Sequence, residues 1–190
     1  MIDDQMLLIR RSELMDLLRE QRACEKIFAN VTIRVARGGS GYWDHEVGMV
    51  GEEVLGYVRT HNRITLRGLE MARNQWLNVG PSPNFMGLGT DEAPPSGSEE
   101  QLGNEVYRKV ISRRLKGPNY AGFMTFFPAS EGTNDTIREV GLFAGAGYTT
   151  DDVPLGGGVL VARATITPIT WVTGDVQFTI TWQISNAAGG

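Results

Sequence analysis

The chain has 190 residues, a net charge of −4, 41% hydrophobic residues and 21% charged residues. This composition is that of a folded globular protein and excludes a chain that is disordered throughout. The net negative charge argues against a protein that coats nucleic acid. A membrane-spanning helix needs about 20 consecutive apolar residues, and no run in the sequence approaches that, so we expect no membrane contact.

Charge and glycine content divide the chain near residue 79. Residues 1–78 have no net charge, whereas residues 79–190 carry the whole acidic excess and most of the glycine and proline. We therefore expect two regions: residues 1–60 as an N-terminal helical arm and docking segment, and residues 61–190 as a helix followed by a β-rich module. The single cysteine, Cys24, cannot form a disulfide within the chain.

Two segments have the periodicity of helices. In residues 4–26 an apolar stripe runs along one face, with charged residues on the others; the stripe consists of Leu7, Leu14, Leu17 and Leu18. It is too short for a coiled coil, and we expect it to form contacts between chains, the alternative being the edge of its own core. A second helix is expected over residues 64–77, with Thr60 or Asn62 as its cap.

The period changes to that of β-strands after Asn84. Candidate strands span residues 85–89, 106–114, 120–127, 136–143, 158–167 and 175–185, and a short strand is expected at 31–35. In the last candidate Phe178, Ile180 and Trp182 share one face and are predicted core residues, while Thr and Gln residues occupy the other. Strands joined by turn-rich loops predict an antiparallel β-sandwich preceded by a helical arm, mainly β and α+β overall.

Motifs for catalysis, cofactors and metals are weak. Gly87-Leu88-Gly89-Thr90 lacks the third glycine of a dinucleotide loop and the Lys-Ser or Lys-Thr pair of a phosphate loop. Adjacent residues on an extended chain point to opposite faces, so Asp44-His45-Glu46 cannot converge on a metal without further ligands. No nucleophile elbow accompanies either histidine. We therefore expect no enzymatic activity, no cofactor and no metal site.

Three charged residues interrupt apolar strand runs. Arg138 and Glu139 lie in the candidate strand at 136–143, and Arg163 lies in the strand at 158–167. Charged residues within such runs pair when they are buried. We predict a structural ion pair between Glu139 and Arg163 on adjacent strands, which would define the strand register.

Six short segments form an ordered series along the chain, at residues 62–69 (NRITLRGL), 86–90 (MGLGT), 102–108 (LGNEVYR), 137–143 (IREVGLF), 160–163 (LVAR) and 178–184 (FTITWQI). This series resembles tail-fibre-like and minor tail structural proteins of tailed bacteriophages. The resemblance implies a β-rich virion module, found in the virion after assembly in the host cytoplasm. It implies a homo-oligomer, with a trimer as the default, that contacts other virion proteins of the tail or neck.

Several functions stay open at this point. The resemblance favours a tail, baseplate, collar or fibre-base subunit that self-associates and docks other virion proteins. One alternative is a receptor- or glycan-binding sandwich with Trp43, Tyr148 or Trp171 as stacking platforms in loops. Capsid decoration and a hydrolase of the host envelope are further alternatives.

Overall fold

The computed structural model describes residues 27–44, 48–70, 82–117, 120–145 and 157–186. The predicted stripe of Leu7, Leu14, Leu17 and Leu18 therefore lies outside the described residues, as does Cys24. The expected N-terminal helix falls in the same undescribed segment.

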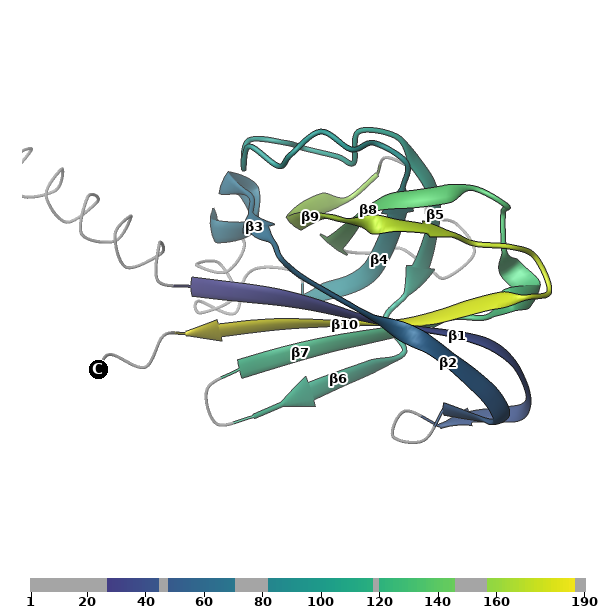
Figure 1. Ribbon diagram of the computed structural model, residues 1–190. Helices are drawn as coiled ribbons and strands as arrows, with labels where there is room; N and C mark the ends of the chain where they lie inside the picture. The colour runs from purple at the N-terminus through teal and green to yellow at the C-terminus, as the bar shows by residue number, and fades with distance from the viewer. Residues whose placement is uncertain (1–26, 45–47, 71–81, 118–119, 146–156, 187–190) are drawn as a thin grey trace, which may run out of the picture.

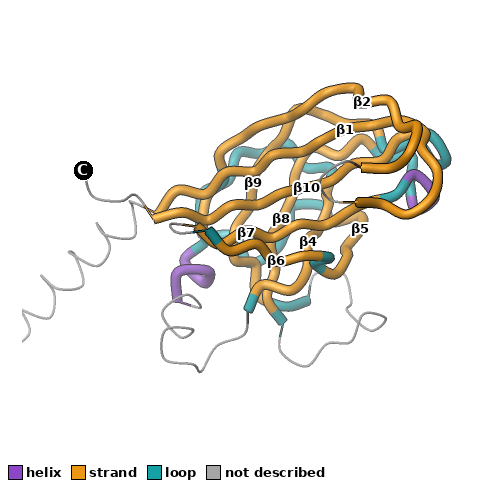
Figure 2. Tube along the Cα trace, turned by 90° about the horizontal axis from the view of Figure 1, so that it is seen from below, coloured by secondary structure: helices purple, strands orange, loops and turns teal. Residues whose placement is uncertain are grey.

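The described chain is mainly β and forms two five-stranded antiparallel sheets (Figures 1 and 2). Sheet A has the strand order β2(Gly48–His61), β1(Ile27–Asp44), β10(Val176–Asn186), β7(Tyr120–Phe127), β6(Arg113–Lys116). Sheet B has the order β3(Arg63–Ile64), β9(Val159–Thr170), β8(Thr136–Ala144), β4(Pro83–Gly89), β5(Glu105–Val110). A short 3-10 helix, η1(Ala129–Glu131), follows β7.

The inward faces of the two sheets share one hydrophobic core. β10 lies at the centre of sheet A, and its Phe178, Ile180 and Trp182 are buried as the alternation predicted. These side chains belong to the same cluster as Leu88 and Leu142 from sheet B. Burial of the two apolar faces against each other is what holds the sheets together.

The outward face of β10 is polar but only partly exposed to solvent. Thr181 and Gln183 are half-buried, whereas Gln177 and Thr179 are buried. Gln177 donates a hydrogen bond of 2.9 Å to Glu52 of β2, and Glu52 also pairs with Arg34 of β1. Side chains of three neighbouring strands thus cover one end of this face.

Our expectation that residues 1–60 form a docking arm needs correction for its second half. β1 pairs with β10 from Ile27↔Asn186 to Arg37↔Val176 and with β2 on its other side, so residues 27–44 and 48–61 are part of sheet A. The local pattern indicated only a short strand because this pairing joins residues far apart in the sequence. Gly38 and Gly39, which look like a flexible break, adopt positive φ angles of 65° and 93° within β1, a conformation open to glycine at little cost.

The second helix begins later than residue 64, and its cap is neither Thr60 nor Asn62. Arg63 and Ile64 pair with β9 as strand β3, and residues 66–70 are helical. Thr65 is the cap, since its hydroxyl accepts a 3.0 Å hydrogen bond from the Gly68 N–H. The rest of the expected helix, residues 71–77, lies outside the described residues.

The predicted strand at 106–114 is divided between the two sheets. Its first part is β5 at the edge of sheet B, and its second part is β6 at the edge of sheet A. Ile111 and Ser112 connect them, and Ile111 is buried in the core between the layers. The sequence pattern does not reveal such a change of sheet, because both parts have the composition and period of a strand.

Candidate functional site

The outer face of sheet B is covered by the segment 90–104, which connects β4 to β5. Gly87 and Gly141 lie on this face, where a Cβ would come within 2.7 and 2.8 Å of the Phe143 ring. Their lack of a side chain leaves room for Leu102, which joins a second, smaller hydrophobic cluster with Phe85, Phe143 and Leu160. The covering segment therefore packs closely on the outer face of sheet B through Leu102.

Arg163 of β9 lies at the centre of the charges beneath this cover. Its Nε is 2.7 Å from Glu139 Oε2, its Nη2 is 2.9 Å from Asp91 Oδ2, and its Nη1 is 3.4 Å from Glu99 Oε1. The side chains of Arg163 and Glu139 are 3% and 0% exposed. We call these four residues the Arg163 cluster. The ion pair predicted from the sequence is present, and the covering segment adds two carboxylates to it.

The Glu139 carboxylate also accepts hydrogen bonds from the backbone of the covering segment. It accepts hydrogen bonds from the N–H groups of Asn104 at 2.9 Å, Gly103 at 3.2 Å and Asp91 at 3.4 Å. A Cβ at Gly89 would lie 2.3 Å from Glu139 Oε1. Glycine at position 89 is thus required for the approach of the carboxylate to this backbone.

Glu99 is held in its ionised form by its own loop. Burial alone would raise its pKa, but hydrogen bonds from the N–H groups of Ser96 and Gly97 outweigh this effect and lower the pKa of Glu99 to about 2. For Arg163, burial disfavours the charged form, whereas the hydrogen bond and the Coulomb attraction from Glu139 prevail and raise its pKa. The negative charges of Asp91 and Glu99 add to this effect, so the carboxylates around Arg163 favour its charged form.

A second buried ion pair lies beside the cluster on the same face. Arg108 of β5 pairs with Glu105 at 2.5 Å, and their side chains are 2% and 5% exposed. The Arg108 guanidinium also lies 3.8 Å from the centre of the Phe143 ring, a cation–π contact. Its Nη1 donates to the carbonyl of Gly157, at the start of the segment that enters β9.

This arrangement suits a structural role better than acid–base chemistry. A general acid or base must reach a substrate proton directly or through one water, whereas the Glu139 carboxylate is fully buried and bound to Arg163 and to three backbone N–H groups. The geometry joins two strands and one long loop into a single rigid unit.

Sequence reasoning missed Asp91 and Glu99 as partners of Arg163. Both lie in a loop whose acids are typical of a solvated turn, and the contact brings together residues separated by more than 60 positions. The glycines at positions 87, 89 and 103 are the signal that could have indicated these partners, because glycine allows another segment to approach closely. A Cβ at Gly103 would lie 2.1 Å from Asp91 Oδ2.

The other candidate residues from the sequence are Arg138 and the three aromatic residues considered as stacking platforms. Arg138 pairs with Glu92 at 2.5 Å near the surface and does not compete for Glu139. Trp171 cannot serve as a stacking platform, because it is 0% exposed and packs edge-on against Tyr107, Phe127 and Phe178. Tyr148 lies outside the described residues, as does the side chain of Trp43.

The described part of the chain has neither a metal-binding group of side chains nor a membrane-spanning helix. Among the described residues, no group of three or more His, Cys, Asp or Glu side chains could hold a metal ion. His45 and Glu46 lie outside that part. Within it, no helix has the length and apolar character needed to cross a membrane.

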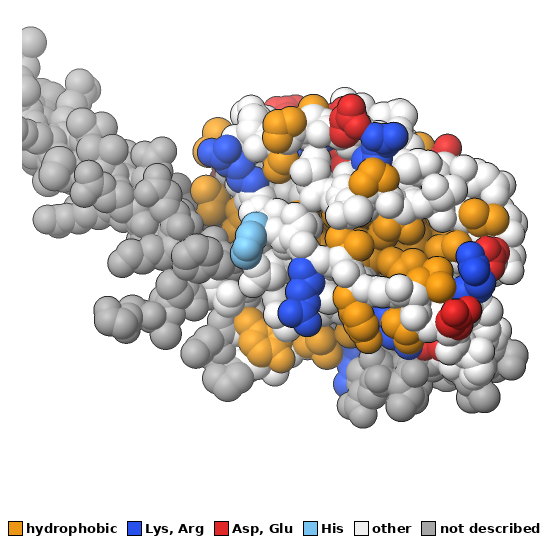
Figure 3. Space-filling view, viewed as in Figure 1, with side chains coloured by type: hydrophobic (Ala, Val, Ile, Leu, Met, Phe, Trp, Pro, Cys, Tyr) orange, Lys and Arg blue, Asp and Glu red, His pale blue; other side chains and the backbone are white. Residues whose placement is uncertain are grey.

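One side of the molecule exposes hydrophobic side chains between the two sheets. There β2, the edge strand of sheet A, runs close to β9 of sheet B. A hollow of about 340 Å³ lies between them, and its apolar lining includes Val35, Leu55, Val58, Pro168 and Ile169. Figure 3, in the view of Figure 1, shows hydrophobic side chains gathered over this region.

No protein-family model matches the chain, and neither the curated proteins nor the solved structures contain a match.

Proposed function

We propose that this chain is a structural subunit of a tailed-phage virion, located in the tail, baseplate, collar or fibre base. It folds as a β-sandwich module, self-associates, and docks other virion proteins. Residues 1–26 form its helical arm, whose leucine stripe contacts neighbouring chains. The ordered series of motifs that resembles tail-fibre-like and minor tail proteins is the reason for choosing this class.

The observation that carries the proposal is the convergence of the motif residues on one structural unit. Gly89, Gly103, Glu139 and Arg163 come from four of the six segments and meet in or around the Arg163 cluster. In a fifth segment Gly68 packs so closely on β9 that a Cβ would lie 2.0 Å from the Val161 carbonyl oxygen. Residues with this much packing and ion-pairing between them support a role in architecture.

The open side between β2 and β9 supports association with other protein chains. Large exposed apolar areas on soluble proteins mark interaction surfaces, and an uncovered sheet edge offers unpaired backbone groups to another strand. In a symmetric assembly of identical subunits, every copy buries this surface against a neighbouring copy.

Immunogold labelling tests the location directly. Antibodies raised against the purified chain are applied to particles of the virus that encodes it, with antibodies to the major capsid protein as a reference. We expect gold at the tail or its base. Gold spread over the capsid shell would instead favour decoration of the capsid, and absence of the chain from purified particles would contradict a virion role.

A further inference from the structure

The outer face of sheet A has a group of polar side chains at one end, arranged in two rows across β2, β1 and β10. Directly paired residues point to the same face of a sheet, so the strand register defines each row. The first row is Arg59, Thr32 and Thr181, and the second is His61, Asn30 and Gln183. We call these six residues the polar grid. It measures about 10 Å across the strands and about 7 Å along them.

A hollow of about 600 Å³ lies over the polar grid, which supplies most of its lining together with Val31 and Thr60. This volume lies in the range of small-ligand sites. The floor is formed by β1 and β10, each of which has a neighbouring strand on both sides. Their backbone groups are used within the sheet, so a ligand in the hollow meets side chains, and addition of a peptide strand to this floor is excluded.

The side chains of the polar grid are available to a ligand. Within the described part of the chain, none of the six forms a side-chain hydrogen bond or an ion pair. The opposite end of the same face differs, because Gln177 and Arg34 both bind Glu52 there. Donors and acceptors are therefore used internally at one end of the face and left unused at the other.

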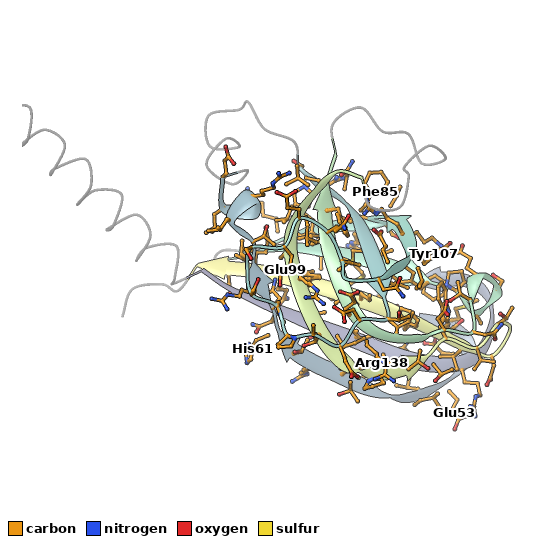
Figure 4. The ribbon with its side chains drawn as sticks, turned by 90° about the horizontal axis from the view of Figure 1, so that it is seen from above. Glu53, His61, Phe85, Glu99, Tyr107 and Arg138 are labelled. Carbon is orange, nitrogen blue, oxygen red and sulfur yellow. The ribbon has the colours of Figure 1, made fainter. Side chains whose placement is uncertain are left out.

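The charge of the hollow is positive. Arg59 is exposed, and the described lining contains no Asp or Glu. Figure 4 shows His61 at one end of β2 and Glu53 at the other, so the nearest acids of this strand lie away from the hollow. A single guanidinium matches a single carboxylate, whereas nucleic acid is bound by several cations along its phosphates.

We infer that the hollow binds a short acidic saccharide, a disaccharide unit that carries a carboxylate. Hydroxyl groups of Thr32 and Thr181 and amide groups of Asn30 and Gln183 both donate and accept hydrogen bonds, as the hydroxyl groups of a sugar do. Arg59 pairs with the carboxylate. The area of the polar grid matches two sugar rings lying side by side. This inference goes beyond the proposed function and does not rest on it.

Titration with a matched pair of disaccharides tests the site. Digalacturonic acid carries carboxylates where the neutral galactobiose of the same linkage carries hydroxymethyl groups. Each is added to the full chain while the amide resonances are followed by NMR. We expect digalacturonic acid to shift the amides of residues 30–32, 59–61 and 181–183, and to bind about fivefold more tightly than galactobiose because of the ion pair with Arg59.

Three variants separate the contributions of charge and hydrogen bonding. Arg59→Gln should weaken digalacturonic acid by about fivefold and change the affinity for galactobiose by less than about twofold. Thr181→Val keeps the shape but removes the hydroxyl, so it should weaken both saccharides by about threefold. Arg113→Gln is the control, since Arg113 continues the first row through Met124 to the opposite edge of the sheet, outside the hollow. It should change neither affinity.

Four results would overturn the inference. They are the absence of amide shifts with either saccharide, shifts confined to other parts of the chain, galactobiose binding as tightly as digalacturonic acid, and unchanged binding of digalacturonic acid by Arg59→Gln. Sodium acetate at the same concentration of carboxylate is the last control. Equal shifts with acetate would show a site for simple anions and would equally overturn saccharide binding. None of these results bears on the location of the chain in a virus particle.

Discussion

Arg163 and Glu139 illustrate the conflict between burial and charge in single residues. Removing both groups from water costs several kcal/mol for each ion. Their mutual contact at 2.7 Å and the backbone N–H donors around Glu139 offset that cost only while every partner is in place. Such a pair defines which strands and loops meet, more than it adds net stability.

A double-mutant cycle measures this dependence. Arg163→Met should destabilise the fold by about 3–5 kcal/mol, because it leaves the buried Glu139 carboxylate without its counter-ion. Glu139→Gln should cost a similar amount. The double variant should cost less than the sum, since neither unpaired charge remains. Free energies of unfolding from urea titrations provide the comparison.

The exposed pair of Arg138 and Glu92 supplies the matched control for that cycle. It joins the same strand, β8, to the same covering segment, but its side chains are 38% and 78% exposed. Arg138→Met should cost no more than about 1 kcal/mol. Additive effects of the Arg163 and Glu139 changes would show that the two residues do not act as a pair.

Among the structural elements, the segment 90–104 is unusual because it has no regular secondary structure and yet covers a sheet. Backbone groups in such a segment need partners from elsewhere. Glu139 supplies them for Asp91, Gly103 and Asn104, and Glu99 supplies them for Ser96 and Gly97. Two carboxylates therefore take the place of a neighbouring strand as hydrogen-bond acceptors.

Acid should loosen this segment through Glu99. Its pKa is lowered from the usual 4.5 to about 2, so the ionised form stabilises the fold above pH 4.5, and this contribution is lost as the pH falls toward 2. In Glu99→Gln the contribution is absent at every pH. We therefore expect the free energy of unfolding to fall less steeply over this range in the variant than in the original chain.

The neighbouring Glu100→Gln is the control for the acid titration, because Glu100 pairs with Arg67 at the exposed surface. Its stability should follow the original chain across the acid range. A Glu99→Gln curve parallel to the original would mean that the carboxylate is not held by the Ser96 and Gly97 amides in solution.

At the scale of the whole molecule, the proposed function assigns residues 1–26 to contacts with other chains. Among the residues whose burial the structure describes, the two sheets bury their inner faces against each other with side chains that include Val31, Ile33, Phe178 and Ile180. The leucine stripe of residues 1–26 is left for contacts with other chains under the proposed function.

Removal of residues 1–26 tests this division. The shortened chain should unfold in one cooperative transition close to that of the full chain, and should no longer assemble with neighbouring chains. It should fail to enter virus particles, as judged by immunoblots of purified particles. An unfolded product would show that the N-terminal segment belongs to the chain's own core, and the docking role would have to be abandoned.

The sequence by itself determined the features that depend on local period and residue type. The alternation in β10 indicated its buried face, and the strand bounds of β7 follow from its own residues. The apolar runs around Glu139 and Arg163 were enough to predict that these two charges pair. Each of these inferences uses neighbours in the sequence or one complementary pair.

Only the tertiary structure decided the assembly of these parts. It placed residues 27–44 and 48–61 in sheet A, divided the strand at 106–114 between two sheets, and brought Asp91 and Glu99 to Arg163. It also left β2 as an edge with exposed Leu55 and Tyr57. The contact of Glu99 with Arg163 joins residues 64 positions apart, and the pairing of Ile27 with Asn186 joins residues 159 positions apart. Local periodicity contains no information on which distant strand offers the complementary edge.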